Sequence, residues 1–145
     1  MSRVKLKFPD ENPRYTATIP VRIGDINYGG HAGNDAILSI VHEARMQMFR
    51  SYGYTEMSVG GISTIMADVM IAYKGESFYG DDLIVKIYTD EIKEHSFDLL
   101  YNITTLRNRV QIDIAHAKTG IVCFDYNFRK VAIMTEELKQ FLQGI

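Results

Sequence analysis

The fold depends most on residues 23–35, which read Ile23-Gly24-Asp25-Ile26-Asn27-Tyr28-Gly29-Gly30-His31-Ala32-Gly33-Asn34-Asp35. This stretch contains four glycines, two Asp, two Asn and one His, and it precedes the longest helical pattern in the chain. The first N–H groups of a helix have no partner within the helix, and the helix dipole is positive at that end. A Gly-rich turn that leads into a helix therefore predicts a site for electron-rich atoms.

The helix that follows is predicted to begin with Asn34 or Asp35 as its N-cap and to end at Tyr52, just before Gly53. At about 100° per residue, apolar side chains form one wide stripe. The stripe comprises Ile37, Leu38, Ile40, Val41, Ala44, Met48, Phe49 and Tyr52. Such a wide arc indicates a helix that a sheet largely surrounds. Arg45 and His42 interrupt it, and we expect a partner for His42 because a buried imidazole requires one.

The rest of the chain has the period of β-strands. Residues 15–23 are rich in β-formers, and Pro20 favours an edge position or a bulge there. Residues 62–73 are apolar at both odd and even positions, which is typical of a strand covered on both sides. Alternating strands follow over 83–88 and 97–104.

Residues 107–109 read as a hairpin tip, and the strand over 110–126 should bend at Gly120. Connections of hairpin length between successive strands predict an α+β fold, with an antiparallel sheet packed on one long central helix. The open edges of such a sheet need protection, and pairing them across a dimer is one solution.

At 145 residues, the chain is predicted to be one domain, with a lead-in over 1–13 and a capped terminal helix over 135–145. A net charge of −2 gives no electrostatic reason to expect a nucleic acid or an anionic membrane as partner. Cys123 is the only cysteine, so no internal disulfide forms, and its apolar neighbours indicate a buried structural thiol. We find no signal peptide and no apolar span, and we expect a cytoplasmic protein.

Two motifs carry a resemblance to a known family. Residues 21–34, continued by His42-Glu43-Ala44-Arg45, resemble the pattern V-R-[YF]-x-D-x-D-x-x-G-H-x-x-N followed by a helical E-A-R or E-x-A-R. Residues 73–83 resemble the Y…G-D-x-L motif between the second and third strands of the same family. That family is the hotdog-fold acyl-CoA thioesterases of the 4-hydroxybenzoyl-CoA thioesterase type, and the resemblance covers roughly residues 14–130.

The resemblance implies a hotdog fold, in which a sheet wraps around one helix and two sheets join in a dimer. It implies an active site at the dimer interface, where the Gly-rich turn and helix N-terminus of one subunit meet the other. A homodimer or a homotetramer formed as a dimer of dimers is therefore expected. The implied reaction is hydrolysis of an acyl-CoA or related thioester without a metal or redox cofactor, with CoA present only as part of the substrate.

The catalytic group departs from the family pattern. The second acidic residue of the turn falls on Asn27, and an amide is neither a general base nor a carboxylate nucleophile. The acidic position of the helix falls on His42 or Glu43, depending on a shift of one residue. The catalytic candidates are therefore Asn27, His42, Glu43 and Asp25. Each also has a plain structural interpretation: turn residues for Asn27 and Asp25, a hydrogen-bonded buried imidazole for His42, and a solvated helix carboxylate for Glu43.

The candidate substrate-binding residues are five residues of the Gly-rich turn and one tyrosine at the end of a predicted strand. Backbone N–H groups near Gly30-His31 and at the helix N-terminus are expected to polarise the thioester carbonyl. The candidate binding residues are Tyr28, Gly29, Gly30, His31, Asn34 and Tyr73. A non-hydrolytic acyl-CoA or acyl-carrier binding protein on the same fold is the alternative, and the amide at position 27 favours it.

Overall fold

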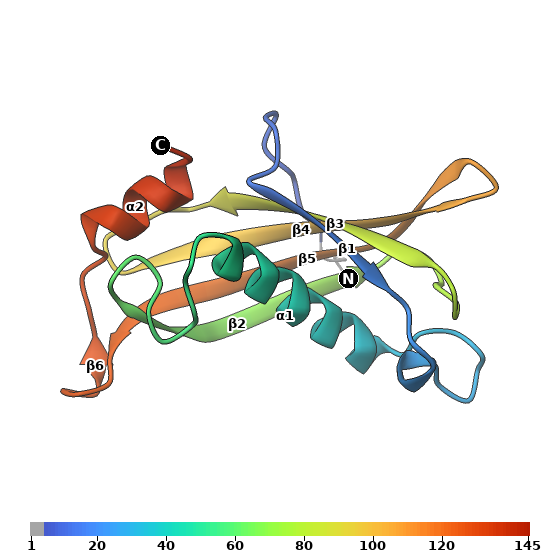
Figure 1. Cartoon of the computed structure of the whole chain (residues 1–145), viewed down its shortest axis with the longest axis horizontal. Helices are drawn as coiled ribbons and strands as arrows, with labels where there is room; N and C mark the ends of the chain where they lie inside the picture. Colours follow the sequence, from blue (N-terminus) through green and yellow to red (C-terminus); the bar gives the residue numbers. More distant parts are fainter. Residues whose placement is uncertain (1–4) are drawn as a thin grey trace.

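The computed structural model describes residues 5–145, so the first four residues of the predicted lead-in lie outside the described residues. The elements follow the predicted order of one strand, one long helix, a series of strands and a terminal helix. They are β1 (Tyr15–Pro20), the 3-10 turn η1 (Ile23–Asp25), α1 (Asn34–Ser51), β2 (Ser63–Tyr73), β3 (Asp82–Asp90), β4 (Ser96–Arg107), β5 (Val110–Asp125), β6 (Lys130–Val131) and α2 (Glu136–Gln143). The predicted α+β class is confirmed, and Figure 1 shows α1 lying across one face of the sheet.

The sheet is antiparallel throughout, with the strand order β1-β3-β4-β5-β2 and with β6 paired to β5. The β4–β5 connection is the predicted hairpin tip, where Asn108 and Arg109 both have positive φ, at 53° and 66°. Strand β5 is continuous through Gly120, where a bend was predicted. The pairing with β2 is irregular at this glycine, between Met66 and Asp68, and the Asp68 carboxylate accepts the Gly120 N–H at 3.1 Å.

Alternation along the strands builds the core between α1 and the sheet. The inward side chains of β3 and β4 are fully buried, as predicted: Leu83, Val85, Ile87, Phe97, Leu99, Tyr101 and Ile103. Most of the helix stripe is buried against them, but Tyr52 is half exposed at the end of α1. Helix α2 covers the same end, where Phe141 packs edge-on against Tyr52. The core therefore holds α1 along its whole length and fixes its N-terminus beside the turn.

The start of α1 differs from the prediction. Gly33 is the N-cap, with φ −73° and ψ 163°, and its carbonyl accepts the N–H groups of Ala36 and Ile37. Asn34 and Asp35 are the first two helical residues, and no side chain caps the helix. A Cβ at Gly33 would lie 2.6 Å from Asp35 Oδ1, so a larger residue there would require the Asp35 side chain to move. The predicted helix end is correct, since Tyr52 is the C-cap and Gly53 has a φ of 77°.

Strand β2 is the second exception. It forms the last position of the sheet rather than a strand covered on both sides, whereas β1, with Pro20 at its end, occupies the predicted edge. Met66, Val69 and Met70 are 43%, 37% and 36% exposed. The apolar run over residues 62–73 is therefore an edge strand. No residue among 5–145 pairs with its outer edge.

The face of the sheet turned away from α1 carries the segment that precedes β1. The Phe8 ring lies 5.4 Å from the Tyr88 ring and 5.0 Å from the His116 ring, measured between centroids. Within residues 5–145, neither helix combines the length and the hydropathy needed to cross a bilayer.

Candidate active site

The turn before α1 satisfies many of its polar groups internally. The Asp25 carboxylate accepts the backbone N–H of Arg22 at 2.8 Å and lies 3.6 Å from the Arg22 guanidinium. The Asp25 carbonyl accepts the N–H of Gly33 at 3.0 Å, which ties the turn to the helix start. Asp25 therefore occupies the turn-acceptor role that was the alternative to its catalytic role.

Asn27 organises the tip of the turn. Its Oδ1 accepts the Gly29 N–H at 2.9 Å, and its carbonyl accepts the Gly30 N–H at 3.0 Å. These two glycine N–H groups are thus not the free donors to a substrate carbonyl that the sequence predicted, because the turn itself uses them. Tyr28, which follows Asn27 in the turn, is fully exposed.

Free donors lie at the first turn of α1, the other place where the sequence predicted them. The N–H groups of Asn34 and Asp35 donate to no other residue among 5–145. Asn34 lines a cavity of about 250 Å³ together with His31 and Tyr73, and Asp35 is the next residue of the helix. The Tyr73 hydroxyl donates to the Asn34 carbonyl at 3.3 Å, and His31 Nδ1 lies 3.1 Å from the Ala32 carbonyl. The structure therefore brings together three of the six predicted binding residues.

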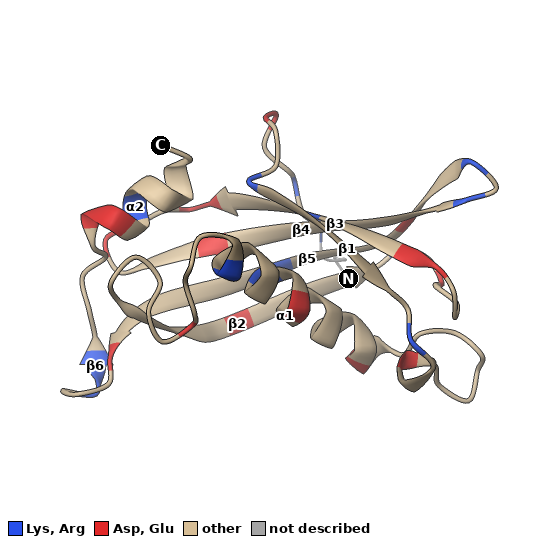
Figure 2. Cartoon of the chain, in the orientation of Figure 1, with Lys and Arg blue, Asp and Glu red and all other residues tan. Residues whose placement is uncertain are grey.

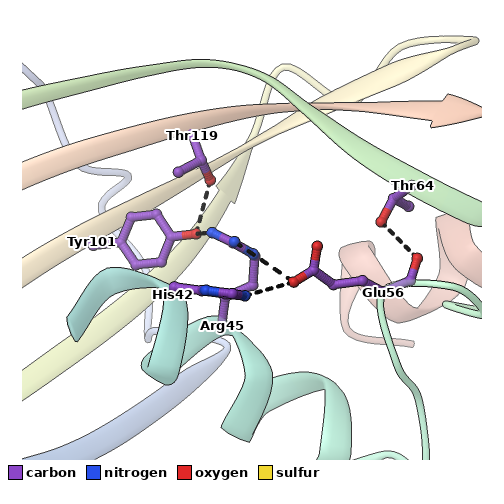
Figure 3. Close-up of polar contacts among 6 residues, drawn as sticks. All are labelled: His42, Arg45, Glu56, Thr64, Tyr101 and Thr119. Atoms are coloured by element: carbon purple, nitrogen blue, oxygen red, sulfur yellow. Dashed lines mark hydrogen bonds and ion pairs between the residues drawn. The ribbon is translucent and has the colours of Figure 1, made fainter. Parts of the chain in front are cut away.

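A second polar cluster lies in the middle of α1, where the helix faces the sheet (Figure 3). Arg45 is only 5% exposed, and its Nη1 donates to the Tyr101 hydroxyl at 3.3 Å. The Tyr101 hydroxyl lies 2.8 Å from Thr119 Oγ1. Burial raises the pKa of Tyr101, so its hydroxyl keeps its proton. Because a guanidinium can only donate, the Tyr101 oxygen accepts from Arg45, and either hydroxyl can be the donor between Tyr101 and Thr119.

Glu56 connects this cluster to His42. Its Oε1 lies 2.7 Å from His42 Nε2 and 3.9 Å from Arg45 Nη2. Its carbonyl accepts both the N–H and the hydroxyl of Thr64, at 3.0 Å and 3.1 Å, so the backbone of Glu56 is fixed to the start of β2. Sequence analysis missed Glu56, since it lies in a loop 14 residues beyond His42 and belongs to no motif.

His42 is not the buried imidazole that the helical stripe suggested. Its side chain is 56% exposed at the edge of the stripe, and Arg45 is the polar residue that the sheet buries. The predicted partner exists, but it is a carboxylate from a loop. Glu43 points away from the sheet, accepts a hydrogen bond from Gln47 at 2.8 Å, and lines an outer groove of about 330 Å³ together with His42.

The two clusters are separate within one protomer. Asn34 and His42 are eight residues apart on α1, which corresponds to about 12 Å along a helix axis. A water molecule at His42 is therefore too far from a carbonyl held at the start of the same helix. Among the candidates, the structure brings His31, Asn34 and Tyr73 together and places His42 and Glu43 in a different neighbourhood.

Other reactive or charged groups form no further centre in the part of the chain described. Cys123 is buried as predicted, and burial raises the pKa of its thiol to about 11. No group of three or more His, Cys, Asp or Glu side chains within residues 5–145 could hold a metal ion. Lys and Arg are spread over several strands, loops and helices rather than gathered on one of them (Figure 2).

A family model described as the thioesterase-like superfamily matches residues 21–142, from the end of β1 to α2. The chain belongs to this superfamily. The match includes both polar clusters of α1, and it confirms the resemblance on which the predicted fold and reaction rested.

Named relatives agree with this assignment. The chain is 30% identical over 132 residues to a 1,4-dihydroxy-2-naphthoyl-CoA hydrolase from Acaryochloris marina, covering 89% of this chain and 94% of that protein. The crystal structure of a 1,4-dihydroxy-2-naphthoyl-CoA thioesterase from Synechocystis superposes with a TM-score of 0.78 at 22% identity, covering 89% and 95% of the two chains. A gentisyl-coenzyme A thioesterase superposes with a TM-score of 0.74 at 15% identity, covering 88% and 99%. The two structural likenesses establish the fold.

Proposed function

We propose that this protein hydrolyses an acyl-CoA thioester to a free acid and CoA, as a homodimer with two composite sites. The observation that carries the proposal is the pair of unpaired N–H groups at the start of α1, beside a cavity lined by His31 and Tyr73, in a chain of the thioesterase-like superfamily. The named relatives supply the substrate class, since each acts on a CoA thioester according to its name.

Hydrolysis requires donors that stabilise the carbonyl oxygen and a base that activates water. The N–H groups of Asn34 and Asp35, with the positive end of the helix dipole, would stabilise the negative charge that develops on the carbonyl oxygen. His42 would remove a proton from water as the water oxygen attacks the carbonyl carbon. The C–S bond then breaks, and the imidazolium returns the proton to the departing sulfur. The products are one carboxylic acid and one thiol, so the atoms balance.

A dimer would bring these groups together. Strand β2 is long, apolar and exposed along its outer side, and such an edge favours pairing with another strand. Tyr73, at the end of β2, lines the cavity, and Thr64, near its start, fixes Glu56. Because a two-fold axis at β2 reverses the strand direction, each helix N-terminus would face the middle of the partner helix.

Asn27 has a positioning role in this proposal. It falls on the acidic position of the family pattern that the sequence resembles, and in the proposal it holds the turn through the Gly29 and Gly30 N–H groups rather than activating water. Asp25 is engaged in the same turn, and Glu43 is paired with Gln47. His42 is therefore the base that the contacts favour among the four candidates. The lack of a cofactor and the cytoplasmic location stay predictions from the sequence.

The decisive experiment combines two inactive variants. His42→Ala removes the proposed base, and Asn34→Pro removes one proposed carbonyl donor. Heterodimers carrying one of each are purified by two different tags and are assayed with a panel of aryl- and alkyl-CoA thioesters and a thiol reagent. A composite site predicts about half of the wild-type activity, because one of the two sites then receives both intact groups.

The alternative outcomes separate the parts of the proposal. Inactive heterodimers from an active wild-type protein would show that the site is not composite. Acyl-CoA binding by the wild-type protein without release of CoA above the buffer rate would exclude hydrolysis and leave the binding-protein alternative. Elution of the wild-type protein at the mass of one chain in light scattering would contradict the dimer.

A further inference from the structure

The contacts of Glu56 give it a role that no motif assigns. We infer that Glu56 is a positioning residue for His42: it accepts the Nε2 proton, leaves Nδ1 free to take a proton from water, and is itself held by Arg45. The inference rests on the proposed function for its kinetic consequence, but the state of the His42 ring can be measured independently of any substrate.

The direction of the hydrogen bond determines the tautomer. An ionised carboxylate can only accept, so the 2.7 Å contact requires His42 Nε2 to carry the proton. A neutral imidazole has one protonated and one unprotonated nitrogen, which leaves the Nδ1 lone pair available. No residue among 5–145 forms a hydrogen bond to Nδ1. His42 also lines the outer groove, and its side chain is 56% exposed, so water can reach it.

Glu56 is fixed from two sides. Its backbone carbonyl is held by Thr64 of β2, and its carboxylate lies between His42 and the buried Arg45. Arg45 cannot turn toward solvent without leaving the Tyr101 hydroxyl, which is itself bound to Thr119 of β5. The sheet therefore holds the carboxylate through Arg45, and the carboxylate holds the imidazole.

This arrangement favours the protonated intermediate as well as the starting tautomer. When His42 takes the proton from water at Nδ1, the imidazolium that forms lies against a negative charge at Nε2. The proton then leaves from Nδ1 to the thiolate sulfur, and the ring returns to its original tautomer. Glu56 neither gains nor loses a proton in the cycle, and it touches no reacting atom.

Another pair of the same kind provides a control within the chain. Glu94 Oε2 lies 4.0 Å from His95 Nε2, and the Glu94 side chain is 71% exposed, against 36% for Glu56. The Glu94 pair lies near α2, outside both polar clusters of α1. Glu94→Gln therefore makes the same chemical change without altering the support of His42.

The kinetic test compares Glu56→Gln and Glu94→Gln in the full-length protein. Glu56→Gln should lower kcat at least about tenfold with KM little changed, because general-base catalysis depends on the proton state and orientation of the base. Glu94→Gln should leave both constants at the wild-type values. In a His42→Ala background, Glu56→Gln should have no further effect on the residual rate, since its role is exercised through His42. An equal loss in both backgrounds would show a merely structural role and overturn the inference.

Two-bond ¹H–¹⁵N correlation spectra report the tautomer of His42 without substrate. The wild-type ring should be protonated at Nε2, and Glu56→Gln should add a population protonated at Nδ1, because the new amide can also donate to Nε2. A wild-type ring protonated at Nδ1 would refute the inference even if the enzyme is active. If no acyl-CoA is hydrolysed but the tautomers behave as expected, the proposed function fails and the Glu56–His42 pairing stands.

Discussion

The two polar clusters of α1 differ in how their groups find partners. At the N-terminal turn, Asp25 and Asn27 bind backbone groups within eight residues of themselves. In the middle of the helix, Arg45 and His42 bind residues from β4 and from the loop before β2. The turn is therefore held by local sequence and leaves N–H groups free at the start of α1, where Tyr73 of β2 adds one long-range contact to Asn34. The second cluster is built by tertiary packing and supplies an oriented imidazole. In the proposed reaction, the carbonyl donors and the base both come from α1, at separate places along the helix.

The largest expected effect is the loss of the base in the second cluster. His42→Ala should lower kcat about 100-fold or more with KM little changed, which is the usual contribution of a positioned general base. Glu43→Ala should retain most of the activity, because that carboxylate is paired with Gln47 on the outer face of the helix. Steady-state kinetics with one acyl-CoA from the panel measures both. A loss of kcat in Glu43→Ala that equals or exceeds the loss in His42→Ala would contradict His42 as the sole base and favour Glu43.

The next effect is the loss of a donor in the first cluster. Asn34→Pro removes one free N–H while proline suits the first position of a helix, and Gly33 already has the extended backbone that a following proline requires. We expect kcat to fall about 100-fold, as for the loss of one oxyanion donor. Asn34→Ala keeps the N–H and should remain active. Unchanged kcat in Asn34→Pro, with helical content preserved by circular dichroism, would mean that this N–H does not bind the carbonyl.

The difference between the clusters also explains what the sequence could and could not predict. The order of elements, the inward residues of β3 and β4 and the tip at Asn108-Arg109 follow from periodicity and turn chemistry over a few residues. The two family motifs, at residues 21–34 and 73–83, supplied His31, Asn34 and Tyr73 as binding candidates, and the structure brings these three together. Glu56 could not be predicted, because its meeting with His42 depends on how the loop at 53–62 returns over the helix. Strand β2 was wrongly predicted as covered on both sides, since an apolar run in a sequence does not say whether the same chain or, as in the proposed dimer, a second copy would cover it.

A smaller effect tests whether the second cluster is a structural unit. Tyr101→Phe should lower the free energy of unfolding by about 1–3 kcal/mol, because the buried Arg45 and Thr119 each lose a hydrogen-bond partner. Tyr88→Phe is the matched control, since its hydroxyl forms no hydrogen bond with any residue among 5–145. Urea denaturation gives both values. A loss in Tyr101→Phe no greater than in the control would mean that the buried hydroxyl does not stabilise Arg45.

The smallest effect distinguishes a positioning amide from a displaced catalytic acid. Asn27→Asp restores the carboxylate of the family pattern, and the new oxygen can still accept the Gly29 N–H that Asn27 Oδ1 accepts at 2.9 Å. If His42 is the base, kcat should change little, and the His42→Ala, Asn27→Asp double variant should stay as inactive as His42→Ala alone. The kcat values of Asn27→Asp, His42→Ala and the double variant are compared in the same acyl-CoA assay. Asn27→Ala is the control, because it removes the oxygen that accepts the Gly29 N–H. Recovery of activity in the double variant would show that the turn, and not the middle of the helix, faces the attacking water.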